Sequence, residues 1–194
     1  MNPVRLVLFT RYPVPGTAKT RLIPTLGPDG AALVHKKLTE RTVEILRQTG
    51  AKVEIHYSGG DDQTLTTWLG DDLSYVPQPT GDLTARLLAA IHPGPVIFLG
   101  SDTPDLTVDH VVAAQRALQR SEVVIGPADD GGYYLIGLQK PHSFLFEDMR
   151  WSTEHVMPDT LARLQQRGMR YEILEILHDC DRPEDLDRWP WLTR

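Results

Sequence analysis

The run Val96-Ile97-Phe98-Leu99-Gly100 restricts the possible folds of this chain more than any other stretch. A strand with one face in water alternates apolar and polar residues, whereas a strand buried on both faces reads as an unbroken apolar run. The run therefore predicts a strand inside a sheet that has helices packed on both of its faces.

Helix-like and strand-like segments alternate along the sequence. Helices are expected over residues 29–48, 64–69, 83–91, 107–120, 154–166 and 183–189, and strands over residues 4–9, 51–58, 96–100, 122–127, 133–138 and 171–177. This alternation predicts one domain over residues 1–194, a three-layer α/β/α fold with a mostly parallel central sheet. Such sheets bind ligands at the carboxyl ends of their strands, so the loops there are where we look for chemistry.

Composition excludes several classes of protein. The 194 residues suit one domain, and the net charge of −6 gives no overall basic field for nucleic acid or an anionic membrane surface. The single cysteine, Cys180, rules out an internal disulfide framework and a cysteine-rich zinc site. No apolar run approaches the roughly 20 residues that span a bilayer, and no secretory signal opens the sequence. We therefore expect a cytoplasmic protein without nucleic-acid or membrane partners.

The loop "FTRYPVPGTAKTRL" follows the first expected strand and carries two cations, Lys19 and Arg21. Its "PGTAKT" segment resembles the end of an ATPase phosphate loop, but that motif needs glycine directly before the lysine, where this chain has Ala18. Two cations and free backbone N–H groups near a helix start suit a diphosphate. The alternative interpretation is a solvated loop with two ordinary surface cations.

Aspartates follow two of the later strands. Asp102 and Asp105 come directly after the buried strand in "FLGSDTPDL", and Asp181 lies in "HDCDRPEDL". Carboxylates at the carboxyl end of a strand suit Mg²⁺ or Mn²⁺, which would neutralise a leaving diphosphate. The alternatives are a turn before Pro104 for Asp102, and helix caps for Asp105 and Asp181. Asp179 is a weaker candidate for the same chemistry.

The segment "GPADDGGYYLIGL" joins two expected strands. Gly131 and Gly132 permit a tight turn between them. Asp130 and Tyr133 on this turn suit a hydroxylated acceptor, with Asp129 beside them. The alternative is a plain hairpin with core tyrosines.

The segment "PQPTGDLTARLLAA" opens a helix after a strand. Gln78 offers an amide that suits recognition of a nucleotide base, and Gly81 and Asp82 shape the loop. Asp82 as a simple helix cap is the alternative.

Several familiar site motifs are missing from the sequence. The seven histidines include no His-x-x-His or His-Glu-x-x-His pair, which excludes a zinc protease at the level of motifs. No Gly-x-Ser-x-Gly motif supports a serine hydrolase, and no Gly-x-Gly-x-x-Gly follows the first strand as it does in dinucleotide oxidoreductases.

Taken together, these stretches resemble the nucleotide-diphospho-sugar transferase superfamily, which has the glycosyltransferase-A fold. Within it, the chain is similar to the bacterial family known as radical-SAM/selenodomain-associated transferase 1, or arsenosugar biosynthesis glycosyltransferase. The resemblance runs from "FTRYPVPGTAKTRL" to "DCDRPEDL" and rests on the order and spacing of the motifs. Arg182 stands where threonine is usual in the last motif.

The resemblance implies a role for each group of residues. Contacts with the nucleotide are implied for Thr10, Arg11, Gly16, Lys19, Arg21, Gln78, Gly81, Asp82 and Ser101. Contacts with the acceptor are implied for Asp105, Asp130, Gly131, Gly132 and Tyr133, and binding of Mg²⁺ or Mn²⁺ for Asp102 and Asp181. Lys19 and Arg21 are expected to offset leaving-group charge, and Asp130 to act as the base, with Asp129 and Asp105 as its competitors.

The expected function is metal-dependent transfer of a sugar from a nucleotide-diphosphate sugar to a small-molecule acceptor. The alternative enzyme is a nucleotidyltransferase, because "AKTRL" and "DCDRPEDL" also resemble 2-phospho-lactate guanylyltransferase, which joins a nucleoside triphosphate to a phosphorylated acid and releases pyrophosphate. Against it, the "G-G-x-G-x-R" loop of nucleotidyltransferases is missing. A third possibility is a nucleotide-binding module without catalysis, which the retained Lys19, Arg21, Asp102 and Asp181 argue against.

Overall fold

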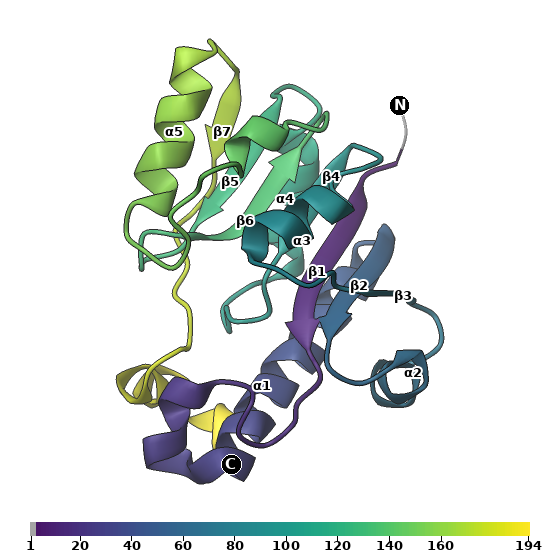
Figure 1. Cartoon of the computed structure of the whole chain (residues 1–194), viewed down its shortest axis with the longest axis vertical. Helices are drawn as coiled ribbons and strands as arrows, with labels where there is room; N and C mark the ends of the chain where they lie inside the picture. The colour runs from purple at the N-terminus through teal and green to yellow at the C-terminus, as the bar shows by residue number, and fades with distance from the viewer. Residues whose placement is uncertain (1–2) are drawn as a thin grey trace.

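Seven strands form one sheet in the order β3-β2-β1-β4-β6-β5-β7 in the computed structural model, which describes residues 3–194 (Figure 1). The strands are β1 Arg5–Arg11, β2 Lys52–Ser58, β3 Ser74–Pro77, β4 Val96–Leu99, β5 Val123–Pro127, β6 Tyr133–Leu138 and β7 Tyr171–Ile173. Only β6 runs against its two neighbours, β4 and β5, while the other neighbouring pairs are parallel. The predicted mostly parallel α/β sheet is therefore confirmed.

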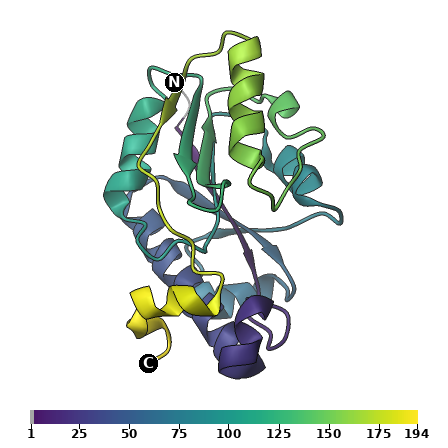
Figure 2. The ribbon, with the colours of Figure 1, turned by 90° about the vertical axis from the view of Figure 1, so that its left-hand side faces the viewer.

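Helices cover both faces of this sheet, as Figure 2 shows for α4 and α5. One face packs against α1 Ile23–Gln48, α2 Asp62–Leu69 and α4 Val108–Ala117, and the other against α3 Leu83–Ala90 and α5 Val156–Gln166. Strand β4 is buried throughout, with Ile97 and Leu99 in the first core and Val96 and Phe98 in the second. The unbroken apolar run thus has the two-sided burial that its sequence predicts.

Helix α1 begins earlier than its sequence suggests. Residues 23–26 form a helical turn, after which Gly27, with φ 70° and ψ 170°, breaks the helix and Pro28 restarts it. Glycine reaches such a conformation without the steric cost of a Cβ, and proline is favoured in a first helical turn. The predicted start at Pro28 and Asp29 is therefore confirmed for the long part of α1, and the short turn before Gly27 is the part that was not predicted.

The start of α1 and the last residues of the chain pack against each other (Figures 1 and 2). A third apolar cluster joins the start of α1 to the last residues through Leu22, Ala31, Val34, Leu38, Cys180, Leu186, Trp189 and Leu192. The predicted helix over residues 183–189 is instead two 3₁₀ segments, η3 Pro183–Arg188 and η4 Pro190–Leu192. Pro190 lacks the N–H that would continue a helical hydrogen-bond ladder.

Helices long enough and apolar enough to cross a membrane do not occur within residues 3–194.

A buried ion pair lies at the start of β1 and β2, at the opposite end of these strands from their carboxyl ends. The Arg5 guanidinium lies 2.6 Å from Glu54 Oε2 and also donates to the carbonyls of Ala90 and Pro93, each at 2.9 Å. Both charged side chains are about nine-tenths buried, with exposed fractions of 12% and 9%. Burial alone would raise the pKa of Glu54, but Lys52 and Arg5 hold it below the ordinary value of 4.5.

We expect Glu54→Gln to lower the free energy of unfolding by about 2 kcal/mol at pH 7, because Arg5 loses its charged partner. A lowered folded-state pKa means that this contribution is complete above pH 4.5 and is lost as the pH falls through the folded-state pKa. Urea unfolding at several pH values measures this difference. Lys52→Gln is the control, with an effect under about 1 kcal/mol, because Lys52 is 60% exposed. Equal effects at pH 7 and in acid would contradict the ion-pair account.

Candidate active site

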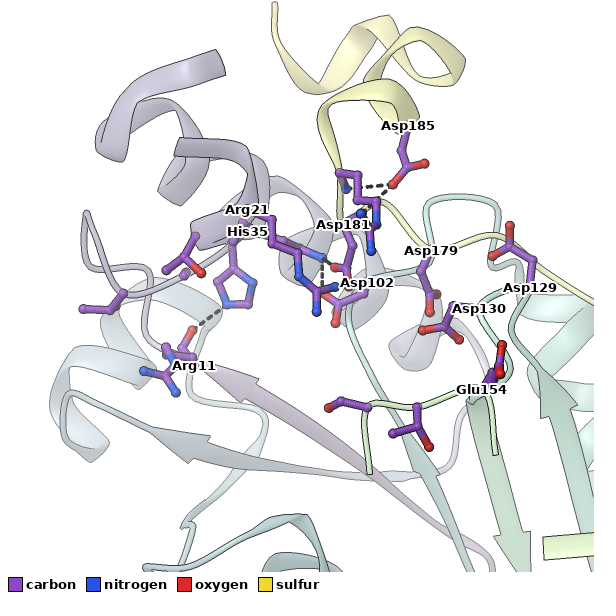
Figure 3. Close-up of a pocket in the computed structure, with 17 residues that line it drawn as sticks. Arg11, Arg21, His35, Asp102, Asp129, Asp130, Glu154, Asp179, Asp181 and Asp185 are labelled. Carbon is purple, nitrogen blue, oxygen red and sulfur yellow. Dashed lines mark hydrogen bonds and ion pairs between the residues drawn. The ribbon is translucent and has the colours of Figure 1, made fainter. Parts of the chain in front are cut away.

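A cavity of about 560 Å³ opens at the carboxyl ends of β1 and β4 (Figure 3). The loop after β1 contributes residues 17–21, and the loop after β4 contributes Asp102. Its other lining residues are Arg11, His35, Asp129, Asp130, Ser152, Thr153, Glu154, Asp179, Asp181, Arg182 and Asp185. Because β1 and β4 are parallel neighbours, their carboxyl ends meet at one edge, where ligands of such sheets bind.

Lys19 joins the two aspartates that the sequence singled out. Its Nζ atom lies 2.6 Å from Asp102 Oδ1 and 2.7 Å from Asp181 Oδ1, and its side chain is only 5% exposed. Arg21 is more exposed and approaches Asp181 Oδ2 at 3.4 Å. The structure thus brings together the loop cations and the carboxylates from two distant segments.

The backbone of Lys19 adopts a left-handed conformation, with φ 46° and ψ 45°. A residue with a Cβ pays about 1–2 kcal/mol for this geometry, which recurs at functional sites where the surroundings fix it. The neighbouring Ala18 and Leu22 are buried on either side, and the ion pairs hold the side chain. This backbone conformation therefore directs the ammonium group of Lys19 toward Asp102 and Asp181.

The charges in this network stabilise one another. Burial alone would lower the pKa of Lys19, but Asp102 and Asp181 outweigh it and hold that pKa above its ordinary value. Burial alone would raise the pKa of Asp102, but the ammonium of Lys19 holds it below its ordinary value. Lys19 and Asp102 are therefore both charged at neutral pH.

The late segment reaches this cavity through Cys180. Its backbone N–H donates to the carbonyl of Asp102 at 2.8 Å, and its side chain is buried in the third cluster. This hydrogen bond fixes the backbone at Cys180, and so it also positions the neighbouring Asp179 and Asp181 at the cavity. Asp185 Oδ2 accepts from the N–H groups of Asp181 and Arg182, which fixes the start of η3.

Asp179 is a carboxyl group with an altered acidity. Thr103 Oγ1 donates to its Oδ1 atom at 2.6 Å. Burial raises the pKa of Asp179 to about 7, and the negative charges of Asp102 and Asp130 add to the effect. In Figure 3 the carboxyl groups of Asp179 and Asp130 lie beside each other at the cavity.

A close backbone approach places Glu154 against the β5–β6 turn. The N–H of Met157 donates to the carbonyl of Gly131 at 2.9 Å, and Gly131 has φ +90°. A Cβ on Gly131 would lie 2.6 Å from the Cα of Glu154. Asp130 Oδ1 accepts from the N–H of Gly132 at 2.9 Å, so the carboxylate is oriented from within the turn.

Some residues expected at the nucleotide serve the scaffold in this structure. Gln78 Nε2 donates to the carbonyls of Thr10 and His56 at 3.0 and 2.6 Å, which joins the ends of β1 and β2. Thr10 is buried and its hydroxyl meets that of Thr39 at 3.1 Å. Asp82 caps α3 by accepting from Ala85 N.

Several other expected residues lie outside the cavity lining. Asp105 accepts from Trp189 Nε1 at 2.9 Å, and Tyr133 packs edge-on against Trp151 with ring centroids 6.3 Å apart. The remaining ones are Gly16, Gly81, Ser101, Gly131 and Gly132. Of the residues predicted from sequence, the cavity brings together Arg11, Lys19, Arg21, Asp102, Asp130 and Asp181, and also the weaker candidates Asp129 and Asp179.

Sequence reasoning missed His35, which reaches the cavity from α1. Its Nε2 atom lies 2.8 Å from the carbonyl oxygen of Arg11, and burial lowers the pKa of its imidazole. The neutral ring donates there and fixes the end of β1. A signal was present, because His35, Thr39 and Thr42 interrupt the buried face of a helix at spacings of four and three. Thr17, Ser152, Thr153 and Glu154 carried no such signal.

Residues 42–153 match the family described as "Uncharacterized protein conserved in bacteria (DUF2064)", and the chain belongs to this family. None of the curated proteins compared with it matches.

Similar solved structures share the fold. A candidate nucleotide-diphospho-sugar transferase from Desulfovibrio desulfuricans G20 has 31% identity and a TM-score of 0.90, with 96% of this chain and 86% of that chain covered. The 4-diphosphocytidyl-2C-methyl-D-erythritol synthase of Anaerococcus prevotii DSM 20548 has 11% identity and a TM-score of 0.67, with 100% and 97% covered. Rv0371c of Mycobacterium tuberculosis H37Rv, in complex with manganese, has 14% identity and a TM-score of 0.56, with 96% and 97% covered.

We expect Gly131→Ala to lower the free energy of unfolding by about 3 kcal/mol, since it adds a positive-φ strain and a contact with the Glu154 backbone. Gly50→Ala is the matched control, because Gly50 has φ +68° and open space around its Cβ position. It should cost about 1 kcal/mol. Urea unfolding compares the two variants, and equal losses would show that the approach of residue 154 is not tight.

Proposed function

We propose that this protein is a glycosyltransferase that moves a sugar from a nucleotide-diphosphate sugar to a hydroxyl group of a small acceptor, with Mg²⁺ or Mn²⁺. One observation carries the proposal. A single cavity has Lys19, Arg21 and Arg11 with two carboxylates at one end, and further carboxylates with hydroxyl groups at the other. The likeness to the Desulfovibrio desulfuricans G20 protein supports it.

The cationic end suits a diphosphate. The buried ammonium of Lys19 and the exposed guanidinium of Arg21 both reach the region of Asp181. Cations already in place stabilise negative charge as it develops on a leaving diphosphate, without reorganisation during the reaction. Arg11 adds a third cation at the end of β1.

Asp102 and Asp181 fit a divalent cation in this scheme. Mg²⁺ is often held by one or two carboxylates together with substrate phosphates, and these two carboxylates already converge on one point, Lys19 Nζ. Residues 3–194 contain no cluster of three or more His, Cys, Asp or Glu side chains around a common point, so substrate oxygens and water would complete the shell. When bound, the cation would neutralise charge on the diphosphate.

The other end of the cavity suits a hydroxyl-bearing acceptor. Asp130 is oriented by Gly132 N and faces the cavity, where it can take the proton of an attacking hydroxyl group. Asp129 and Glu154 add negative charge beside it, and Ser152 and Thr153 add hydroxyl groups. These residues favour polar, uncharged or cationic groups over phosphates.

This charge distribution weighs against nucleotidyl transfer to a phosphorylated acid. In that reaction Lys19 would stabilise the α-phosphate, and the same cationic end would serve. The acceptor phosphate, however, would have to lie against Asp129, Asp130 and Glu154, where like charges repel. Nucleotidyl transfer is therefore the second candidate function, and its support is the end of the cavity with Lys19 and Arg21, which would bind phosphates in either reaction.

Binding of the donor is tested by thermal unfolding with Mn²⁺ and a panel of UDP-, GDP-, ADP- and CDP-sugars beside the four nucleoside triphosphates. A ligand that binds only the native state at a hundredfold excess over its Kd stabilises by about 2.7 kcal/mol. We expect a metal-dependent shift for one diphospho-sugar that exceeds the shift for its triphosphate. A shift for a triphosphate alone would favour nucleotidyl transfer, and no shift would contradict the phosphate site.

Asp130→Asn tests the base once the donor and an acceptor are known. We expect kcat to fall by about 10²–10⁴-fold while the thermal shift with the donor is unchanged, because the amide cannot accept the proton. Asp71→Asn, at an exposed position before β3, is the control and should leave both quantities unchanged. Full activity of Asp130→Asn would exclude Asp130 as the base.

A further inference from the structure

The position of Lys19 has a consequence for metal binding. Its Nζ atom is 2.6 and 2.7 Å from the Oδ1 atoms of Asp102 and Asp181. A Mg²⁺ ion on the same two oxygens would sit about 2.0–2.1 Å from each. The ammonium and the ion would therefore compete for one place, and only one of them can lie between these oxygens.

The network is already electrically balanced without a metal ion. Lys19 and Arg21 supply two positive charges, and Asp102 and Asp181 supply two negative charges. A divalent ion that entered alone would have to displace a cation whose side chain is 95% buried and leave that cation without its partners. An unpaired buried charge is strongly unfavourable.

We propose that Lys19 is the resident counter-cation of Asp102 and Asp181, and that a divalent cation enters only as a complex with a polyphosphate, toward which the ammonium then turns. The inference rests on the proposed function, since it takes the polyphosphate to be the nucleoside diphosphate part of the donor. It makes the metal–nucleotide complex, and not the free ion, the ligand of this site.

The geometry of Lys19 permits such an exchange. A lysine ammonium is a point charge on a flexible four-carbon stem, so it can change partners by rotation about side-chain bonds while the backbone stays in place. Arg21, exposed at the cavity mouth, remains near Asp181 and can guide an anion inward. Metal and nucleoside diphosphate then strengthen each other's binding by the same factor, as linkage requires.

The test is calorimetric titration of Mn²⁺ into the metal-free full-length protein and into Lys19→Gln, which has no positive charge at this position. We expect Lys19→Gln to bind Mn²⁺ at least 10-fold more tightly than the wild type. Arg21→Gln is the matched control: its guanidinium is 59% exposed and touches only Asp181 of the pair, so we expect a change below about threefold. Equal Mn²⁺ affinities of the wild type and Lys19→Gln would overturn the inference.

A second measurement uses the wild type alone and does not depend on the folding of a variant. ADP, CDP, GDP and UDP are titrated with Mn²⁺ and with EDTA, and we expect at least 10-fold tighter binding of one of them with Mn²⁺. A diphosphate that binds equally well under both conditions would overturn the coupling. Tighter Mn²⁺ binding by Lys19→Gln with no diphosphate bound would support the counter-cation role of Lys19, but it would overturn the entry of the metal as a diphosphate complex and contradict the proposed function.

Discussion

Strand β4 is buried on both of its faces, and this burial sets where the helices and the polar residues around it can lie. Val96 and Phe98 belong to one core and Ile97 and Leu99 to the other, so helices must cover both sides of the sheet. The chain can become polar again only where the strand ends. That place is the edge of the sheet where β1 also ends, and it sets Asp102 at the mouth of the cavity.

The charged side chains differ between the two ends of this cavity. Lys19 is held in a strained backbone conformation by two ion pairs, and each partner stabilises the charged form of the other. At the far end, the close approach of Gly131 and Glu154 gathers Asp129, Asp130 and Glu154, and His178 Nδ1 contacts Asp129 Oδ2 at 2.5 Å. In the proposed function, a donor that carries phosphates and an acceptor that carries hydroxyl groups would therefore bind at different ends of one site.

The last residues of the chain complete the site by packing and not by a covalent link. The apolar cluster around Leu22, Leu38 and Trp189 joins the loop after β1 to the C-terminal segment. Cys180 lies within that cluster, and its backbone N–H donates to the carbonyl of Asp102. This hydrogen bond keeps the neighbouring Asp181 beside Lys19. A change that loosens this apolar cluster should therefore also disturb the ion pairs of Lys19 with Asp102 and Asp181.

Local periodicity and the order of the motifs were enough to predict the α/β fold, the buried central strand and the loop that carries Lys19 and Arg21. Tertiary structure decided that Asp181 meets Asp102 through Lys19, that the pKa of Asp179 rises, and that Gln78 turns toward backbone carbonyls. The helical turn over residues 23–26 and the 3₁₀ form of the last segment were not predicted from local sequence. The reason is physical: side-chain direction, burial and the charges nearby arise from segments far apart in the chain, which no local pattern contains.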